Sequence, residues 1–399
     1  MHNTVSVTPS GSAVMAIQED GSVWFWGDQF EDNYFGGSYA HKTTPVKVME
    51  EGVAVSMDEL LQYILLEDGT LWGWGHNQWG DLGDGTFTPK YDPIPIMDDV
   101  FMMKANSGNG AALQNDGCLY YWGSRVYGDF RKPRNNVATP EKALEQVTYF
   151  TEYGGTLLAV LEDDSLWGWG LNDYSQLGQG HNREIPVMEP QKLKENVRNV
   201  WTTGFRTYVL DMDETLWGAG RNPYGEIGIG SIVWEIMEYS PILEDVVDFS
   251  TGIFGGFHCG AITADGRLWM WGDNRKGQLG IGDKDIVESN VPVYVMDQVI
   301  KFHIDGDISI AIRADNSLWV WGTSHENRIE QDFADPSIPN KVSENVHSVY
   351  IGSSTILFLK YDGTLWGWGH NETGQLGDGT FENRSQPVLI MENVRLPEG

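Results

Sequence analysis

The strongest constraint on the fold is a short pattern that recurs eight times along the chain. A typical copy has an acidic turn, then Leu or Val, then aromatic residues separated by one position, and then Gly. The copies begin at Asp20, Asp68, Asp116, Asp163, Asp213, Asp265, Asp315 and Asp362. Consecutive copies start 47 to 52 residues apart, a period typical of propeller blades rather than of helical repeats. Because the repeats extend along the whole chain, we expect residues 1–399 to form a single domain.

Each repeat predicts four β-strands. Apolar residues alternate with a period close to two between Tyr63 and Trp74, where an Asp-Gly turn joins two strands into a hairpin. Successive hairpins are separated by a Pro-led segment, an acidic or Asn-containing turn, and a strand that begins with Val. The prolines of this element are Pro45, Pro93, Pro140, Pro190, Pro241, Pro292, Pro339 and Pro387. The chain is therefore expected to be all-β, with four-stranded blades.

The two ends of the sequence complement each other. The last Pro-led segment, residues 387–394, has no hairpin after it, and the first hairpin, within residues 5–26, has no such segment before it. We therefore predict a closed β-propeller of eight blades in which the N- and C-terminal strands share one blade, so that the last strand completes the first blade. Closure would also remove the exposed edges of an open β array.

The tryptophans are expected to form much of the core. Fourteen of the 17 Trp residues lie in the repeated pattern, and Trp-x-Trp spacing places both rings on one face of a strand. The intervening Gly, as at Gly73 and Gly367, leaves the other face flat for close packing. The rings are therefore predicted to pack between neighbouring blades rather than to bind a ligand.

A second motif follows the tryptophans and connects the chain to a known family. Residues 369–379 read Gly-His-Asn-Glu-Thr-Gly-Gln-Leu-Gly-Asp-Gly, and residues 75–85 and 272–282 are close copies. These segments resemble the regulator of chromosome condensation repeat family, whose units carry Trp-Gly followed by Asn-x-x-Gly-Gln-Leu-Gly. The resemblance implies a β-propeller, and because well-known members have seven blades, seven is the alternative to eight.

The resemblance also implies protein–protein recognition. The family includes nucleotide-exchange factors for small GTPases, a plant ultraviolet-B photoreceptor and a bacterial inhibitor of β-lactamase. The photoreceptor's Gly-Trp-Arg-His-Thr repeats and the exchange factor's basic tail are absent from this sequence. The expected function is a non-enzymatic protein-interaction scaffold. A carbohydrate-binding propeller is the alternative, and a nucleotide-exchange factor is less favoured.

The charge of the chain narrows the class of partner. The formal net charge is −31, with 57 acidic and 26 basic residues, which disfavours binding to nucleic acid or anionic membranes. The sequence has no apolar run of membrane-spanning length and no signal-peptide pattern. We therefore expect a cytoplasmic protein, with a secreted mature chain as the alternative.

Catalytic and metal-binding signals are weak. Cys118 and Cys259 can form at most one disulfide, and the nine histidines show no metal-ligand spacing. Nucleophile-elbow and phosphate-binding motifs are absent, and the Asp-Gly triplets lack the spacing of an EF-hand. No catalytic residue, metal or cofactor is predicted.

The expected topology places acidic turns on one face. In an up-and-down blade, the turn after the Pro-led strand and the turn inside the hairpin emerge at the same end of the sheet. Both are rich in Asp and Glu, as at Glu50, Glu51 and Asp68. Such a rim would attract another protein with a basic surface. The alternative explanation is that these residues serve turn formation and solubility.

The opposite face is expected to carry the long loops and the partner-binding residues. Equivalent positions in four of these loops hold Trp79, Tyr174, Tyr224 and Lys276. The loop from Gly228 to Pro241 is longer than its counterpart from Gly83 to Pro93. It contains Ile232, Val233, Trp234, Ile236, Met237 and Tyr239. Exposed aromatic and apolar groups are common anchors at binding sites, so this loop is the best candidate for a partner-binding surface.

Overall fold

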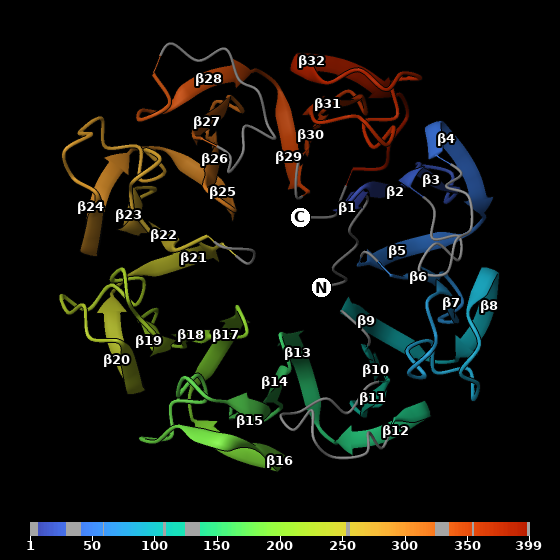
Figure 1. Ribbon diagram of the computed structural model, residues 1–399, viewed down its shortest axis with the longest axis horizontal. Coiled ribbons are helices and arrows are strands. Elements are labelled where there is room, and N and C mark those ends of the chain that lie inside the picture. Colours follow the sequence, from blue (N-terminus) through green and yellow to red (C-terminus); the bar gives the residue numbers. More distant parts are fainter. Residues whose placement is uncertain are drawn as a thin grey trace.

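The computed structural model describes residues 7–28, 41–58, 60–106, 109–123, 136–252, 256–323, 335–352 and 355–396. These residues form eight four-stranded antiparallel sheets arranged as blades in a ring around a central opening (Figure 1). Each blade consists of four strands that are consecutive in sequence. The prediction of an all-β propeller with eight blades is confirmed, and the seven-bladed alternative is wrong.

Within the described residues, the strands follow one another with no helix between them. Blades one to four contain β1 (Val7–Ser10), β2 (Ala13–Ile17), β3 (Val23–Asp28), β4 (His41–Met49), β5 (Gly52–Met57), β6 (Leu61–Leu66), β7 (Leu71–Gly75), β8 (Lys90–Met97), β9 (Val100–Asn106), β10 (Asn109–Gln114), β11 (Leu119–Gly123), β12 (Val137–Leu144), β13 (Val147–Tyr153), β14 (Thr156–Leu161), β15 (Leu166–Asn172) and β16 (Arg183–Lys194). Blades five to eight contain β17 (Val197–Thr202), β18 (Arg206–Asp211), β19 (Leu216–Arg221), β20 (Glu235–Leu243), β21 (Val246–Thr251), β22 (His258–Thr263), β23 (Leu268–Asp273), β24 (Glu288–Met296), β25 (Val299–Asp305), β26 (Ile308–Arg313), β27 (Leu318–Gly322), β28 (Asn340–Ser343), β29 (Val346–Ile351), β30 (Thr355–Lys360), β31 (Leu365–Gly369) and β32 (Arg384–Met391). Among the described residues, no helix is long and apolar enough to cross a bilayer.

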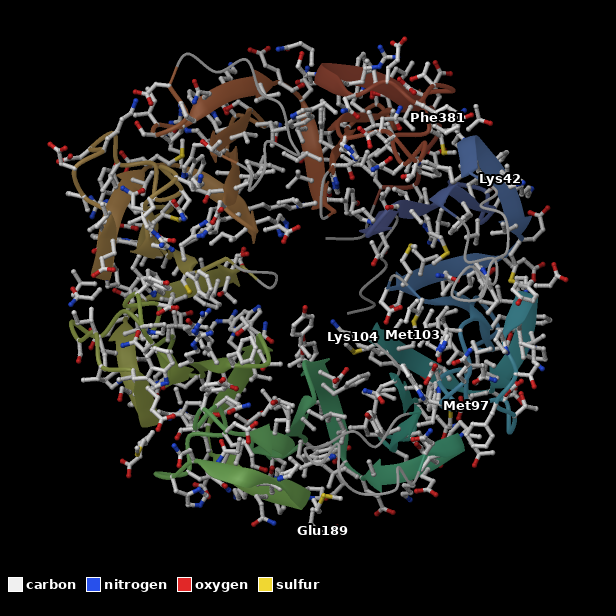
Figure 2. All side chains as sticks on the ribbon, in the orientation of Figure 1. Lys42, Met97, Met103, Lys104, Glu189 and Phe381 are labelled. Carbon is white, nitrogen blue, oxygen red and sulfur yellow. The ribbon has the colours of Figure 1, made fainter. Side chains whose placement is uncertain are left out.

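The first strand of each blade borders the central opening and the fourth forms the outer edge. In Figure 2, Lys104 of β9 lies beside the opening, whereas Glu189 of β16 lies at the periphery. The Pro-led segments enter these outer strands. Proline lacks an N–H donor and is tolerated on an edge strand, which explains why the repeat places it there.

The core consists of eight hydrophobic clusters, each shared by two neighbouring blades. The second Trp of the pattern is fully buried in most blades. In blades one, three, six and seven its indole N–H donates to a carbonyl in the loop of the preceding blade. Trp271 Nε1, for example, lies 2.8 Å from Glu226 O. The first Trp is only half-buried and bonds a hydroxyl in the hairpin turn, as Trp167 does with Ser165. The predicted packing role of the tryptophans is therefore confirmed, and several of the rings also have a polar anchor.

The ring closes through both ends of the chain, but not through the predicted element. The Pro387 segment lies in β32, the outer strand of blade eight, and not in blade one. The residues after β32 make the connection. Val394 bridges Gln18, and the Arg395 N–H donates to Ile17 O at 3.1 Å. Val394 therefore occupies the start of the inner strand of blade one, and β1 supplies the rest.

Blade five departs from the pattern of the core. Its second Trp is replaced by Ala219, which would leave a space next to blade four. The ring of Tyr239 fills this space and lies against Gly178, where the equivalent glycine Gly280 faces Trp321 in another blade. Tyr239 was predicted to be a loop residue, and that prediction is wrong, because β20 begins at Glu235 and directs this ring into the interface between blades.

Candidate functional site

The two faces of the ring differ in their connections. The inter-blade turns and the hairpin turns meet on one face, here called the turn face. There the Glu162 N–H donates to Gln146 O at 2.8 Å, and the Val147 N–H donates to Gly117 O at 2.9 Å. The predicted placement of both acidic turn sets at one end of the sheets is therefore confirmed. The long connections between third and fourth strands occupy the other face, called the loop face.

Many carboxylates of the turn face take part in turn hydrogen bonds. Asp68 Oδ1 accepts the backbone N–H of Thr70 at 2.9 Å and also its hydroxyl. Hydrogen bonding to the neighbouring hydroxyl lowers the pKa of Asp68, and equivalent bonds to Ser165 lower the pKa of Asp163. Glutamates of the inter-blade turns pair with lysines three residues earlier, as in Lys192–Glu195 at 3.0 Å. These acids therefore stabilise turns, and the expected attraction of a basic partner stays a prediction.

The turn face also contains a shallow hollow of about 390 Å³ between blades seven and eight. Asn316, Asn345, Tyr361 and Asp362 line it. The Tyr361 side chain is half exposed and its ring makes an edge contact with His347 at 5.0 Å. An exposed ring beside amide and carboxylate groups is the chemistry that a sugar ring could contact.

On the loop face, the Asn of the family motif has a structural role. Asn172 Oδ1 accepts the Leu177 N–H at 2.9 Å, and Asn222 Oδ1 accepts the Ile227 N–H at 2.8 Å. Each Asn is buried and closes its loop around backbone groups that would otherwise lack partners. The motif therefore holds the loops in a fixed shape, which positions the residues at their tips.

The most distinctive feature of the loop face is an arginine surrounded by aromatic rings. Cζ of Arg221, at the end of β19, lies 5.2 Å from the ring centre of Trp234. Three further ring centres lie 5.7 to 5.9 Å from the same atom, those of Tyr174, Phe205 and Phe257. All are within the range of cation–π attraction. These five residues, here called the Arg221 patch, come from three successive blades, four to six in Figure 1.

The patch combines exposed and anchored groups. The Trp234 side chain is 60% exposed and that of Phe205 is 45% exposed. Tyr174 and Phe205 make an edge contact at 5.4 Å. Tyr224 extends the surface, since its ring lies 5.0 Å from that of Phe257. The result is an apolar surface around a half-buried positive charge.

A buried ion pair lies beneath the patch. Arg206 Nη2 is 2.9 Å from Glu226 Oε1, and both side chains are almost inaccessible to solvent. Arg206 Nε also donates to Arg221 O at 3.0 Å, while Glu226 Oε2 accepts the Tyr224 N–H at 2.8 Å. Burial raises the pKa of Glu226, and the adjacent Arg206 opposes that rise. The buried pair therefore holds the backbone of Arg221 and Tyr224, two residues of the loop face, through hydrogen bonds from the interior.

The structure brings together some of the residues predicted from the sequence. Tyr174 and Trp234 belong to the patch, and Tyr224 borders it. Next to Trp234, the side chains of Ile232 and Val233 are more than half exposed. Along this edge the predicted loop surface is therefore accessible to a partner.

Other predicted residues lie apart from the patch or inside the protein. Ile236 is 9% exposed and packs in the core between blades five and six, so its prediction as a surface residue is wrong. Met237 is exposed on β20. Lys276 is exposed on blade six beside Arg275, which lies over the Tyr224 ring at 4.7 Å. Trp79 lies in blade two against His76 and is not part of the patch.

Sequence reasoning missed three members of the patch. Phe205 and Phe257 lie in the short connections between first and second strands, which carry no motif. Arg221 directly follows Gly220, the Gly that ends the repeated pattern, at a position where other copies have Leu171 or Asp273. The available signal was Arg206 together with Glu226, since the equivalent loop position in three other copies is Gln. Those three residues are Gln176, Gln278 and Gln375.

The metal-ligating and thiol side chains of the described residues form no comparable cluster. No group of three or more His, Cys, Asp or Glu residues among them is arranged to hold a metal ion. Cys118 and Cys259 are both buried and free. Burial raises the pKa of the Cys259 thiol to about 11, so this thiol is protonated near neutral pH and is a poor nucleophile.

The fold and the site together define a β-propeller whose loop face carries an aromatic surface. Models of the regulator of chromosome condensation repeat match residues 163–204, 265–311 and 362–396, and a second model of this repeat matches residues 247–278 and 346–375. The chain therefore contains repeats of the regulator of chromosome condensation type within residues 163–204, 247–311 and 346–396.

Individual relatives agree with this assignment over part of the chain. The regulator of chromosome condensation of Drosophila melanogaster is 23% identical over 156 residues, which are 39% of this chain and 28% of that protein. Alsin of Rattus norvegicus is 34% identical over 76 residues, 17% of this chain and 5% of alsin. The crystal structure of Prp20p from Saccharomyces cerevisiae superposes with a TM-score of 0.61 at 16% identity, over 98% of this chain and 88% of Prp20p. The chain thus matches less than a third of the length of either curated relative. The structural similarity to Prp20p shows that the two proteins share the fold.

Proposed function

We propose that the protein is a non-enzymatic interaction scaffold that binds another protein through the Arg221 patch. The observation that carries this proposal is the cluster of exposed rings around one arginine at the meeting point of three blades. Trp, Tyr and Arg are the residues most enriched at the centres of protein interfaces. The rest of the ring supplies a rigid support, so that little ordering is needed on binding.

The position of the patch supports the same function. Its members lie on short connections and on loops closed by buried Asn side chains, rather than on long unsupported segments. The loop next to it adds the exposed apolar side chains of Ile232 and Val233. A contiguous apolar surface of this kind, with polar groups around it, is typical of a protein-binding site.

The family relationship adds support of a coarser kind. Propellers of this family often mediate protein interactions. The description of the Prp20p structure names binding to Gsp1p and histones, and a second structure shows yeast Prp20 bound by Kap60. These are properties of Prp20. For the present chain they favour a protein partner over nucleic acid, in line with its net charge of −31.

Carbohydrate binding is the second candidate, and it rests on the hollow at Tyr361. The exposed ring could stack on a sugar, and Asn316, Asn345 and Asp362 could bond its hydroxyl groups. Lectin propellers commonly repeat one site around the ring, whereas the equivalent of Tyr361 is Glu67 in blade two and Met212 in blade five. A glycan array probed with the wild type and with Tyr361→Ala would show whether this hollow binds a sugar.

The test of the scaffold function is affinity capture from a lysate of the source cells, followed by mass spectrometry. We would compare the wild type with the double variant Phe205→Ala/Trp234→Ala. A matched control is Phe87→Ala/Met188→Ala, because these side chains are similarly exposed, at 52% and 59%, but belong to other surfaces. Thermal unfolding of all three proteins would confirm that the folds are equally stable.

We expect a protein that is captured by the wild type and by the control but lost from the patch variant. Replacing two interface aromatic residues typically weakens binding by more than about 2 kcal/mol, or roughly 30-fold. Capture that is unaffected by the patch variant would contradict the proposal. Repeating the capture at 0.5 M salt would test the contribution of the turn face, since attraction between exposed charges is screened at high ionic strength.

A further inference from the structure

The guanidinium of Arg221 forms no direct ion pair with a carboxylate of the described residues. Its Nε atom is buried and has no hydrogen-bond partner among them. Arg198, Arg275 and Arg384 each pair with a carboxylate, and Arg313 donates from Nε to Asp297 O. Arg221 differs from these arginines because its buried Nε has no hydrogen-bond partner among the described residues.

The neighbouring carboxylates are already bound to other groups. Glu226 interacts electrostatically with Arg221, but one of its oxygens bonds Arg206 and the other accepts the Tyr224 N–H. Glu235 lies opposite Arg221 in the β19–β20 ladder, and its carboxylate accepts from Asn182 at 2.8 Å. Neither acid therefore neutralises the Arg221 side chain by direct bonding.

The charges around Tyr224 leave Arg221 without a bonded carboxylate. Arg206 and Arg275 pair with Glu226 and Asp273, respectively. Glu235 lies opposite Arg221 in the ladder, but its Oε1 accepts from Asn182. The positive charge of Arg221 is therefore not directly paired, and the exposed Lys276 lies at the adjacent position in blade six. An anionic group of a partner would complement this charge.

The surrounding rings make Arg221 suited to bind such a group. Four aromatic rings within 6 Å contact the planar guanidinium and limit its movement. A guanidinium that is held in this way loses little freedom when it bonds a carboxylate in a bidentate arrangement. The apolar rings also exclude water, which strengthens the charge–charge attraction.

We propose that the Arg221 patch recognises a peptide segment that presents a carboxylate beside an apolar or aromatic side chain. The carboxylate would bond Arg221, and the apolar side chain would pack on Trp234 and Phe205. This inference rests on the proposed scaffold function and specifies the chemistry of the partner. It differs from attraction of a basic protein, which would involve the turn face instead.

The test selects a random dodecapeptide library displayed on phage against the wild-type protein. Enriched peptides would be synthesised and their dissociation constants measured by fluorescence anisotropy, with Asp→Asn or Glu→Gln versions and with free or amidated C-termini. The protein variants are Arg221→Gln and Arg221→Lys, and Arg198→Gln is a matched control because it removes an exposed arginine from the turn side of blade five.

We expect the enriched peptides to contain an acidic residue next to an apolar one. Neutralising that acid, or replacing Arg221 by Gln, should weaken binding about 10- to 100-fold, the range for a charge-assisted hydrogen bond. Combining both changes should weaken it little further, and Arg198→Gln should have no effect. Sensitivity to amidation instead of to the side-chain change would assign the carboxylate to a peptide C-terminus.

Two outcomes would overturn the inference in distinguishable ways. Peptides that depend on Phe205 and Trp234 but bind equally well after the acid is neutralised would leave the scaffold function intact and remove the role of the carboxylate. A failure to enrich any peptide that depends on the patch would count against both proposals. Enrichment of basic peptides would contradict the proposal that the patch recognises a carboxylate. Binding of a second copy of the protein would be seen as a concentration-dependent dimer by analytical ultracentrifugation, abolished by Arg221→Gln, and would replace the peptide as partner.

Discussion

The buried pair between Arg206 and Glu226 allows a quantitative test of how blade five is built. In blade four, the equivalent positions hold Thr156 and Gln176, whose side chains lie 3.4 Å apart. The Gln176 amide accepts the Tyr174 N–H through its oxygen at 3.0 Å, just as Glu226 accepts the Tyr224 N–H. Blade four therefore shows that the fold accommodates a neutral version of the same connection.

The substitution Glu226→Gln should destabilise the protein, although three other repeats have Gln at the equivalent position. It leaves the Arg206 charge buried opposite a neutral amide, and breaking a buried pair typically costs about 3–5 kcal/mol. For a chain of 399 residues, an unfolding entropy of about 0.8 kcal/mol per kelvin converts this cost into a fall in Tm of about 4–6 °C. Arg206→Thr, which leaves the Glu226 charge unpaired, should cost a similar amount.

The double variant Arg206→Thr/Glu226→Gln should be more stable than either single variant. It recreates the neutral pair of blade four and leaves only the cost of a smaller side chain and of the lost bond from Arg206 to Arg221 O, about 1–3 kcal/mol. Differential scanning calorimetry of the four proteins forms a double-mutant cycle. The summed cost of the single variants should exceed that of the double variant by at least about 3 kcal/mol.

A result in which the two substitutions are additive would refute this reasoning. Additivity would mean that the charges do not stabilise each other in the folded protein. The same conclusion would follow if Glu226→Gln were as stable as the wild type. In either case the pair could not be regarded as the support of Arg221 and Tyr224.

Three further predictions concern other parts of the ring. Tyr239→Ala should cost about 3–5 kcal/mol by opening a cavity next to Gly178, and Ala219→Trp in that background should restore part of the loss in calorimetry; no recovery would show that the two residues do not fill the same space. Deletion of residues 387–399 removes most of β32 and the bond from Arg395 to Ile17 O, so Tm should fall sharply, and an unchanged Tm would contradict closure by these residues. The folded-state pKa values of Asp68 and Asp163 are lowered. Their contribution to stability is therefore present above the unfolded pKa of about 3.9 and is lost as pH falls through the folded-state pKa. The urea midpoint of Asp68→Asn should fall less steeply below pH 4 than that of the wild type.

The repeated pattern was sufficient to predict the fold because it carries several independent signals. The hairpin turns, the Pro-led segments and the Val that begins each inner strand together define four strands per period. The position of the acidic turns on one face could be predicted because four antiparallel strands per blade bring the hairpin turn and the inter-blade turn to the same end of the sheet. The closing contact could not be derived in detail, because Val394 and β1 form one composite strand through a bridge to Gln18 that no local pattern indicates.

The candidate site was only partly predictable for a related reason. The sequence identified Tyr174 and Tyr224 because equivalent loop positions can be compared between repeats, and Trp234 because its loop is longer than its counterpart and rich in apolar residues. Phe205 and Phe257 lie in connections without a motif. Phe205 neighbours Arg221 within blade five, where the Arg221 N–H donates to Phe205 O, whereas Phe257 meets Arg221 only when blades five and six are placed side by side. The misplacement of Ile236 has a local cause. The outer strand of blade five begins at Glu235, so one residue of the expected loop enters the core.

The repeats themselves provide the control that an isolated domain lacks. Seven copies show which side chains the blade requires, and blade five departs from them in the interior as well as at the surface. The loss of Trp at Ala219 is compensated by Tyr239, while the Arg206–Glu226 pair replaces a neutral contact with one that breaks even only when both charges are present. The Arg206–Glu226 pair lies directly beneath the surface formed by Arg221 and Trp234, and positioning that surface is a physical reason for retaining the pair.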